Sequence, residues 1–148
     1  MLLTAPPVEA IVVRERLPVN PIMYAYGGLP IVPERRYRVR SDGDGAFEVT
    51  GFPYWPLDAL RQGRPKNVTM RRFLRESEVR ERHASISYVY PEDDAKMRQD
   101  SLTVVDALGG GFWSVDWMRT SRGMWKLIDM ARGEASWWPD DPQETAGQ

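Results

Sequence analysis

Cysteine does not occur in this chain of 148 residues, so disulfide bonds and cysteine-ligated zinc sites are excluded. Histidine occurs once, as His83, which argues against a histidine-rich metal cluster and against a Ser-His-Asp triad. No apolar run reaches the ~20 residues of a membrane-spanning helix, and the N-terminus lacks the pattern of a secretion signal. These absences leave a cytoplasmic protein without a membrane partner as the expectation.

The charges nearly balance, since 20 basic and 21 acidic residues give a net charge of −1. No global field therefore favours nucleic acid or an anionic membrane. Hydrophobic residues make up 42% of the chain, which suffices for the core of one domain at this length. We expect an extended arm over residues 1–9, one domain over 10–139 and a polar tail over 140–148.

The segment 112–138 carries the clearest structural signal. Residues 112–119 and 124–130 are rich in apolar and aromatic side chains, as is typical of strands. Gly123 lies between them and can adopt the positive φ that a tight turn requires. The sequence therefore predicts a β-hairpin here.

The length of the turn decides which side chains of this hairpin face one another. A two-residue loop at 122–123 places Asp116 directly opposite Asp129, and a loop at 121–122 places them diagonally on the same face. An odd-length loop would send them to opposite faces. Two opposed carboxylates repel, and a divalent cation held through oxygen ligands would offset that repulsion. The alternative is a solvated outward pair above three core side chains, Trp117, Trp125 and Leu127.

Residues 34–40 and 46–50 predict a second hairpin, because Asp-Gly turn chemistry separates them. Alternation places three arginines on one face of the first strand together with Glu34; they are Arg36, Arg38 and Arg40. Guanidinium groups in a row suit phosphate oxygens, because each offers a planar fork of donors. A solvent-exposed face is the simpler interpretation of the same stripe.

Four other segments complete the expected fold. Residues 57–62 predict a helical turn and residues 70–83 a helix, whereas the alternating residues 84–90 predict a strand. Residues 100–108 fit either a strand or a buried helix. The arginines of residues 71–80 interleave with glutamates, so a salt-bridged surface is preferred to a nucleic-acid-binding helix. The expected class is α+β, an antiparallel sheet with one or two helices packed on it.

The C-terminal hairpin resembles the last hairpin of the ATP-grasp fold. In that family an Asp on one strand and an acid on the returning strand, followed two positions later by Asn, hold the Mg²⁺ that bridges the ATP phosphates. The resemblance implies that Asp116 and Asp129 are metal ligands. Ala131 occupies the Asn position and cannot ligate metal.

The second hairpin is similar to a branch of ATP-grasp proteins, many of them phage-encoded. A loop like residues 29–32 there leads into Glu-x-Arg on a strand, a Gly turn and a Tyr-Trp-Pro like residues 54–56. The resemblance implies that Glu34 and Arg36 lie in the nucleotide cleft, with Arg36 stabilising charge on the phosphate or acyl substrate. The predicted strand 10–17 looks like the hinge strand of that fold, which implies that Glu15 contacts the nucleoside.

The resemblance spans residues 11–138 and implies the C-terminal lobe of an ATP-grasp fold, with ATP and Mg²⁺ as cofactors. It implies an activity related to ATP-dependent ligases, which activate a carboxylate as an acyl phosphate for attack by an amine. The preceding lobe of such enzymes has no counterpart in the sequence, so we expect a partner chain or a homo-oligomer to supply it. The alternative is a catalytically inactive remnant that acts as a binding or structural protein, as in a phage.

Overall fold

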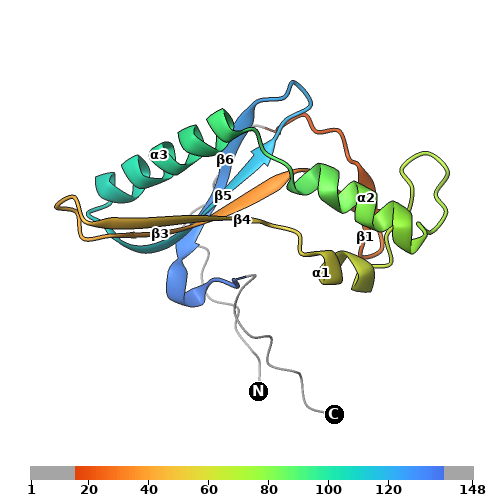
Figure 1. The fold of residues 1–148 in the computed structure, drawn as a ribbon, viewed down its shortest axis with the longest axis horizontal. Helices are drawn as coiled ribbons and strands as arrows, with labels where there is room; N and C mark the ends of the chain where they lie inside the picture. The colour runs from red at the N-terminus through yellow and green to blue at the C-terminus, as the bar shows by residue number, and fades with distance from the viewer. Residues whose placement is uncertain (1–15, 139–148) are drawn as a thin grey trace, which may run out of the picture.

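A four-stranded antiparallel sheet forms the centre of the computed structural model, which describes residues 16–138 (Figure 1). Its strand order is β4-β3-β5-β6. The strands are β3 (Glu34–Ser41), β4 (Phe47–Pro53), β5 (Gly111–Arg119) and β6 (Trp125–Arg132). A second antiparallel sheet pairs β1 (Met23–Ala25) with β2 (Leu29–Ile31). Both predicted hairpins and the predicted α+β class are confirmed.

Within residues 16–138, three α-helices and one short 3-10 helix accompany the sheets. They are α1 (Leu57–Gln62), α2 (Glu76–Ser87), α3 (Pro91–Ala107) and η1 (Gly133–Ala135). The bounds of α1 agree with the prediction for residues 57–62. Residues 100–108, which fitted a strand or a helix, form the end of α3 and the residue after it.

The beginning of α2 lies later in the chain than predicted. The side chain of Asn67 accepts hydrogen bonds from the backbone N–H groups of Thr69 and Met70, which closes a turn there. The helix begins at Glu76 instead, where the Glu78 carboxylate accepts from the Arg75 backbone N–H at 2.8 Å. Local side-chain bonding therefore shifts the helix start.

The strand predicted over residues 84–90 is wrong, because α2 continues to Ser87. Ile86 is buried in the core next to Val79, about two turns earlier on the same helix face. Ser85 hydrogen-bonds to the carbonyl of Glu81 and so stays within the helix. The short alternation of apolar and polar residues was compatible with both the strand period and the helix period, and the burial of Ile86 favours the helix.

Two hydrophobic clusters stabilise the fold. The first joins one face of the large sheet to α3, through Tyr37, Val39, Val115 and Trp117 on the sheet and Met97, Leu102 and Val105 on the helix. The second joins the small sheet to α1 and α2 through Met23, Ile31, Leu60, Val79 and Ile86. Figure 1 shows α3 along the large sheet, whereas α1 and α2 gather with β1 beyond its end.

No helix within residues 16–138 is long and apolar enough to cross a membrane. The predicted arm, the predicted tail and most of the predicted strand 10–17, including Glu15, lie outside the described residues.

Candidate functional site

The turn between β5 and β6 is longer than predicted. The Thr120 backbone N–H donates to the Met124 carbonyl at 2.8 Å, so the turn contains three residues, and Gly123 has a φ of 82°. The strands leave this turn with Arg119 opposite Trp125 and Trp117 opposite Leu127. An odd-length turn of this kind would send Asp116 and Asp129 to opposite faces.

A β-bulge in β6 returns the two aspartates to the same face of the hairpin. The register shifts between Asp116 and Trp117, and Ile128 is the extra residue. Asp116 consequently lies directly opposite Asp129, and both side chains belong to the face that α3 does not cover. The pairing of the two aspartates that a two-residue loop would give is present, but a three-residue turn followed by a bulge produces it.

Arg36 lies next to Asp116 on the neighbouring strand β3 and forms a buried ion pair with it. The Arg36 Nε donates to Asp116 Oδ1 at 2.8 Å, and Nη2 donates to Oδ2 at 2.7 Å. The two residues are 8% and 4% exposed. A third donor, Nη1, donates to the Trp137 carbonyl at 2.6 Å. Such a two-pronged pair fixes both side chains against rotation.

Aromatic rings cover the arginine stripe. Trp138 lies over Arg38 at 4.6 Å and over Arg36 at 5.9 Å, and Tyr54 lies over Arg36 at 4.9 Å. The indole N–H of Trp138 donates to the Gly133 carbonyl, which anchors the ring beside η1. The arginine face is therefore buried at Arg36 and exposed only towards Arg40.

Glu34 lies two residues before Arg36 on the same face and is half-buried. Burial raises the pKa of Glu34 to about 7, and the nearby charge of Asp116 adds to this rise. Burial lowers the pKa of Arg36, but the hydrogen bonds and charge of Asp116, helped by the charge of Asp129, raise it overall. We call Glu34, Arg36, Asp116 and Asp129 the carboxylate site. The charges of these four side chains influence one another, and the Glu34 carboxyl can hold a proton near neutral pH.

The carboxylate site fits a metal that arrives with a nucleotide better than a metal held by protein alone. Within residues 16–138 no three acidic or histidine side chains are spaced to hold a metal ion. Mg²⁺ in nucleotide sites takes one or two protein carboxylates and completes its shell with phosphate oxygens and water. Asp129 is exposed, and Asp116 keeps carboxylate lone pairs beyond the two that Arg36 uses.

Sequence reasoning missed several neighbours of the carboxylate site. Ser114 lies opposite Ala131 and hydrogen-bonds to Ser136 Oγ at 2.7 Å, so a hydroxyl group faces the position where the family has Asn. Tyr54 and Trp138 cover Arg36 from two other parts of the chain. The Tyr-Trp-Pro and Trp-Trp-Pro sequences were the only signals that could have indicated Tyr54 and Trp138. Nothing in the spacing indicated Ser114.

In comparisons with known proteins, the chain matches no family model, no curated protein and no solved structure. The resemblance to ATP-grasp proteins therefore stays a prediction from the sequence motifs.

Proposed function

We propose that this chain is an ATP-grasp-like module that binds Mg-ATP and is related to ATP-dependent carboxylate–amine ligases. The pairing of Asp116 with Asp129 beside Arg36 and Glu34 supports this proposal most strongly. A bulge brings the two acids to one face despite an odd-length turn, and Arg36 forms its ion pair with Asp116 and not with the opposed Asp129.

Each residue of the carboxylate site has a role in this proposal. Asp116 and Asp129 would hold the Mg²⁺ of the nucleotide, and that ion would neutralise phosphate charge. Glu34, with its pKa near 7, can exchange a proton or a hydrogen bond with the ligand at neutral pH. Glu15 would contact the nucleoside, as the family resemblance implies.

Arg36 has a double role in the proposal. Three of its hydrogen bonds hold Asp116 and the Trp137 carbonyl, and a guanidinium has five N–H donors in all. A phosphate oxygen would have to reach the remaining donors beneath Tyr54 and Trp138, where the guanidinium charge would stabilise a developing negative charge. The opposite side of the cleft would come from a partner chain or a second copy of this chain.

A second candidate function follows from the neutralisation of Asp116. The ion pair with Arg36 already balances the charge of Asp116, and Ala131 offers no ligand where the family has Asn. In a catalytically inactive remnant, the same ion pair would only stabilise the sheet, and the chain would act as a binding or structural protein, as in a phage.

Calorimetric titration with ATP, with and without Mg²⁺, tests the nucleotide proposal. Asp129→Asn is the informative variant, because Asp129 is exposed and its loss leaves the buried ion pair intact. We expect Mg-ATP to bind the wild-type chain and to bind the variant roughly tenfold more weakly, which equals about 1.4 kcal/mol. Asp44→Asn, at an exposed position in the β3–β4 turn, is the matched control.

The two candidate functions give different results in this titration. Binding without ATP turnover, even when candidate partner chains are added, favours the inactive remnant. Mg-independent binding, or equal affinities for Asp129→Asn and Asp44→Asn, contradicts the metal role of Asp129. No binding under any of these conditions removes the nucleotide proposal altogether.

A further inference from the structure

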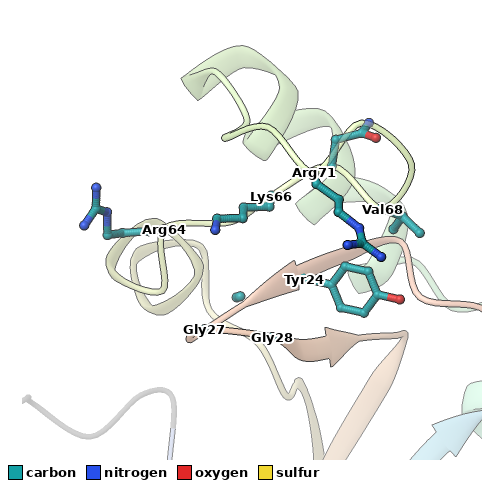
Figure 2. Close-up of a pocket in the computed structure, with 9 residues that line it drawn as sticks. Tyr24, Gly27, Gly28, Arg64, Lys66, Val68 and Arg71 are labelled. Carbon is teal, nitrogen blue, oxygen red and sulfur yellow. The ribbon is translucent and has the colours of Figure 1, made fainter.

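A pocket of about 360 Å³ lies between β1 and the segment that joins α1 to α2 (Figure 2). Three cationic side chains line it, Arg64, Lys66 and Arg71, and its lining contains no acidic residue. In Figure 2, Arg71 extends towards the ring of Tyr24, and Lys66 lies between Arg64 and Arg71. We call this the basic pocket. None of its lining residues belongs to the carboxylate site.

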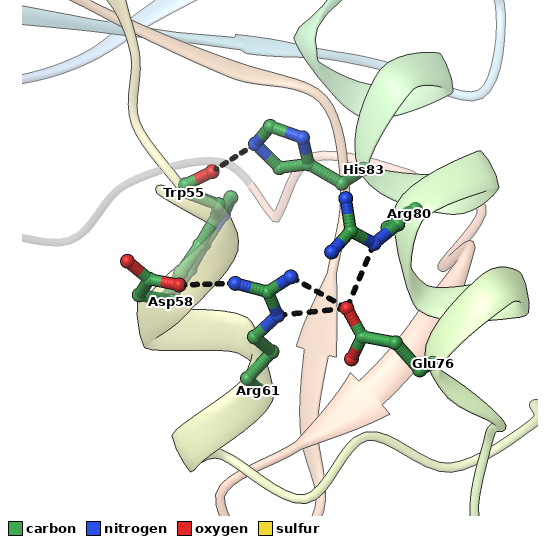
Figure 3. Close-up of polar contacts among 6 residues, drawn as sticks. All are labelled: Trp55, Asp58, Arg61, Glu76, Arg80 and His83. Carbon is green, nitrogen blue, oxygen red and sulfur yellow. Dashed lines mark hydrogen bonds and ion pairs between the residues drawn. The ribbon is translucent and has the colours of Figure 1, made fainter.

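Among the described residues, the three cations lack acidic partners, whereas Arg61, Arg72 and Arg80 nearby each pair with a carboxylate. Figure 3 shows Arg61 joined to Asp58 and Glu76, and Arg80 joined to Glu76. Within residues 16–138, no ion pair involves the three cations of the basic pocket. In a chain whose net charge is −1, such a local excess of positive charge attracts an anion.

The backbone around the basic pocket is held in an uncommon conformation. Arg64 and Arg71 have φ values of 49° and 54°, and Tyr26, next to the lining residue Ala25, has a φ of 50°. These three are the non-glycine residues with positive φ in the part of the chain that the structure describes. Such strained residues gather preferentially at binding sites.

Hydrogen bonds keep this backbone in place. Lys66 exchanges two backbone hydrogen bonds with Tyr24, at 2.7 and 3.1 Å. The Arg71 backbone N–H donates to the Asn67 carbonyl. The Asn67 side chain in turn accepts from the backbone N–H groups of Thr69 and Met70. The positions from which the cations project are therefore fixed before any ligand arrives, which lowers the entropy lost on binding.

Two glycines complete the lining. A Cβ atom added to Gly27 or Gly28 would meet no other atom within 4 Å, so the space above both residues is open. The Gly27 backbone N–H has no acceptor within residues 16–138 and can donate to a ligand. Backbone N–H groups next to cationic side chains are a common way to bind phosphate.

We propose that the basic pocket binds the phosphate group of a small phosphorylated molecule. Arg71 offers a planar fork of donors that matches phosphate oxygens. The Lys66 ammonium lies over the Phe73 ring at 4.8 Å and adds a second charge beside the pocket. Arg64 lies over the same ring at 4.9 Å and extends away from Arg71 in Figure 2, so it adds positive charge at longer range. The pocket volume falls in the range of small-molecule sites, roughly 300–1,000 Å³. This site lies outside the proposed nucleotide site and needs no metal ion.

Titration of the full chain with glycerol phosphate, followed by the backbone amide signals in NMR, tests the proposal. The buffer contains a metal chelator, so that binding at the carboxylate site does not contribute. We expect saturable shifts at Gly27, Gly28 and Lys66. Glycerol without phosphate should produce none.

Arg71→Asn is the key variant, because asparagine tolerates the left-handed backbone that Arg71 adopts. We expect it to weaken glycerol phosphate binding roughly tenfold, whereas Arg122→Asn, at an exposed position in the β5–β6 turn, should leave the affinity unchanged. Lys66→Gln provides a second test if Arg71→Asn fails to fold. Asp129→Asn should have no effect, so failure here is distinguishable from failure of the nucleotide proposal.

Three results would overturn the proposal. The first is the absence of saturable shifts at millimolar glycerol phosphate. The second is an equal loss of affinity in Arg71→Asn and Arg122→Asn. The third is stronger, steeply salt-dependent binding of a single-stranded oligonucleotide without a terminal phosphate at the same amides, which would indicate a nucleic-acid strand as the ligand.

Discussion

The two faces of the large sheet are built from the same strands, yet they are stabilised in different ways. On the face covered by α3, Tyr37 and Val39 pack against Val105 in an apolar cluster. On the other face, Arg36 and Asp116 form a buried ion pair beneath aromatic rings. Both faces bury side chains at their centre, so burial alone does not distinguish a structural core from a site with reactive groups.

The difference between the faces lies in how polar atoms are satisfied. The α3 face keeps its charged groups at the margin, where Asp94 accepts from the Tyr37 hydroxyl and from Arg98. The opposite face places its charges at the centre and relies on one carboxylate to balance one guanidinium. A buried charge that loses its partner is far more costly than a lost apolar contact of the same size.

The largest expected effect is on the ion-pair face. Asp116→Ala leaves the Arg36 guanidinium buried without its carboxylate, and we expect the free energy of unfolding to fall by about 3–5 kcal/mol. Urea denaturation measures this loss. Asp129→Ala, at the exposed position opposite, should change stability by less than about 0.5 kcal/mol. Equal losses in the two variants would mean that the ion pair does not stabilise this face.

The matching change on the α3 face is Met97→Ala. Met97 is 2% exposed and packs against the sheet, so its truncation should cost about 3 kcal/mol of unfolding free energy through lost contacts and a cavity. The neighbouring exposed Lys96→Ala is the control in the same denaturation experiment. A loss as small as that of the control would contradict the assignment of α3 to the core.

The pH dependence of stability should differ between the faces because of Glu34. Its folded-state pKa of about 7 exceeds the ordinary value, so protonated Glu34 stabilises the fold at acid pH, and this contribution disappears as the pH rises from about 4.5 through 7. Glu34→Gln should therefore be more stable than wild type at pH 8 by about 2 kcal/mol and similar to it at pH 4. Denaturation curves at both pH values measure this, and parallel pH profiles would contradict it.

The smallest effect concerns a neutral hydrogen bond on the α3 face. The Trp117 indole N–H donates to Ser101 Oγ at 2.9 Å, and Ser101 is fully buried. Ser101→Ala should lower the free energy of unfolding by about 1 kcal/mol, because the indole donor loses its acceptor. Thr103→Ala, on the exposed side of the same helix, should show a smaller loss in thermal denaturation. The reverse order would indicate that the hydrogen bond contributes nothing.

Much of the sheet was predictable from sequence because alternation in a strand is a local property. The stripe of Arg36, Arg38 and Arg40 was predictable to share one face, and the structure places them so. Its aromatic cover was not predictable, because Trp138 reaches the stripe from a distant part of the chain. The basic pocket was equally hidden, since β1 and the segment after α1 meet only in the folded chain.

The register of the C-terminal hairpin was likewise only partly predictable from the sequence. Its two strands follow from local composition, but the turn has three residues and a bulge at Ile128 compensates for it. Two unpredicted features thus combine into the predicted pairing of Asp116 with Asp129. The prediction of a strand over residues 84–90 failed outright. Its alternation was too short to outweigh the burial of Ile86 as part of a helix.

Local pattern accounts for the strands, the turn glycines and the sharing of faces, because each depends on neighbours a few positions away. Long-range packing accounts for which face α3 covers, for the ion pair of Arg36 with Asp116, and for the cations of the basic pocket. Those features depend on desolvation and charge balance between segments that are adjacent only after the chain has folded.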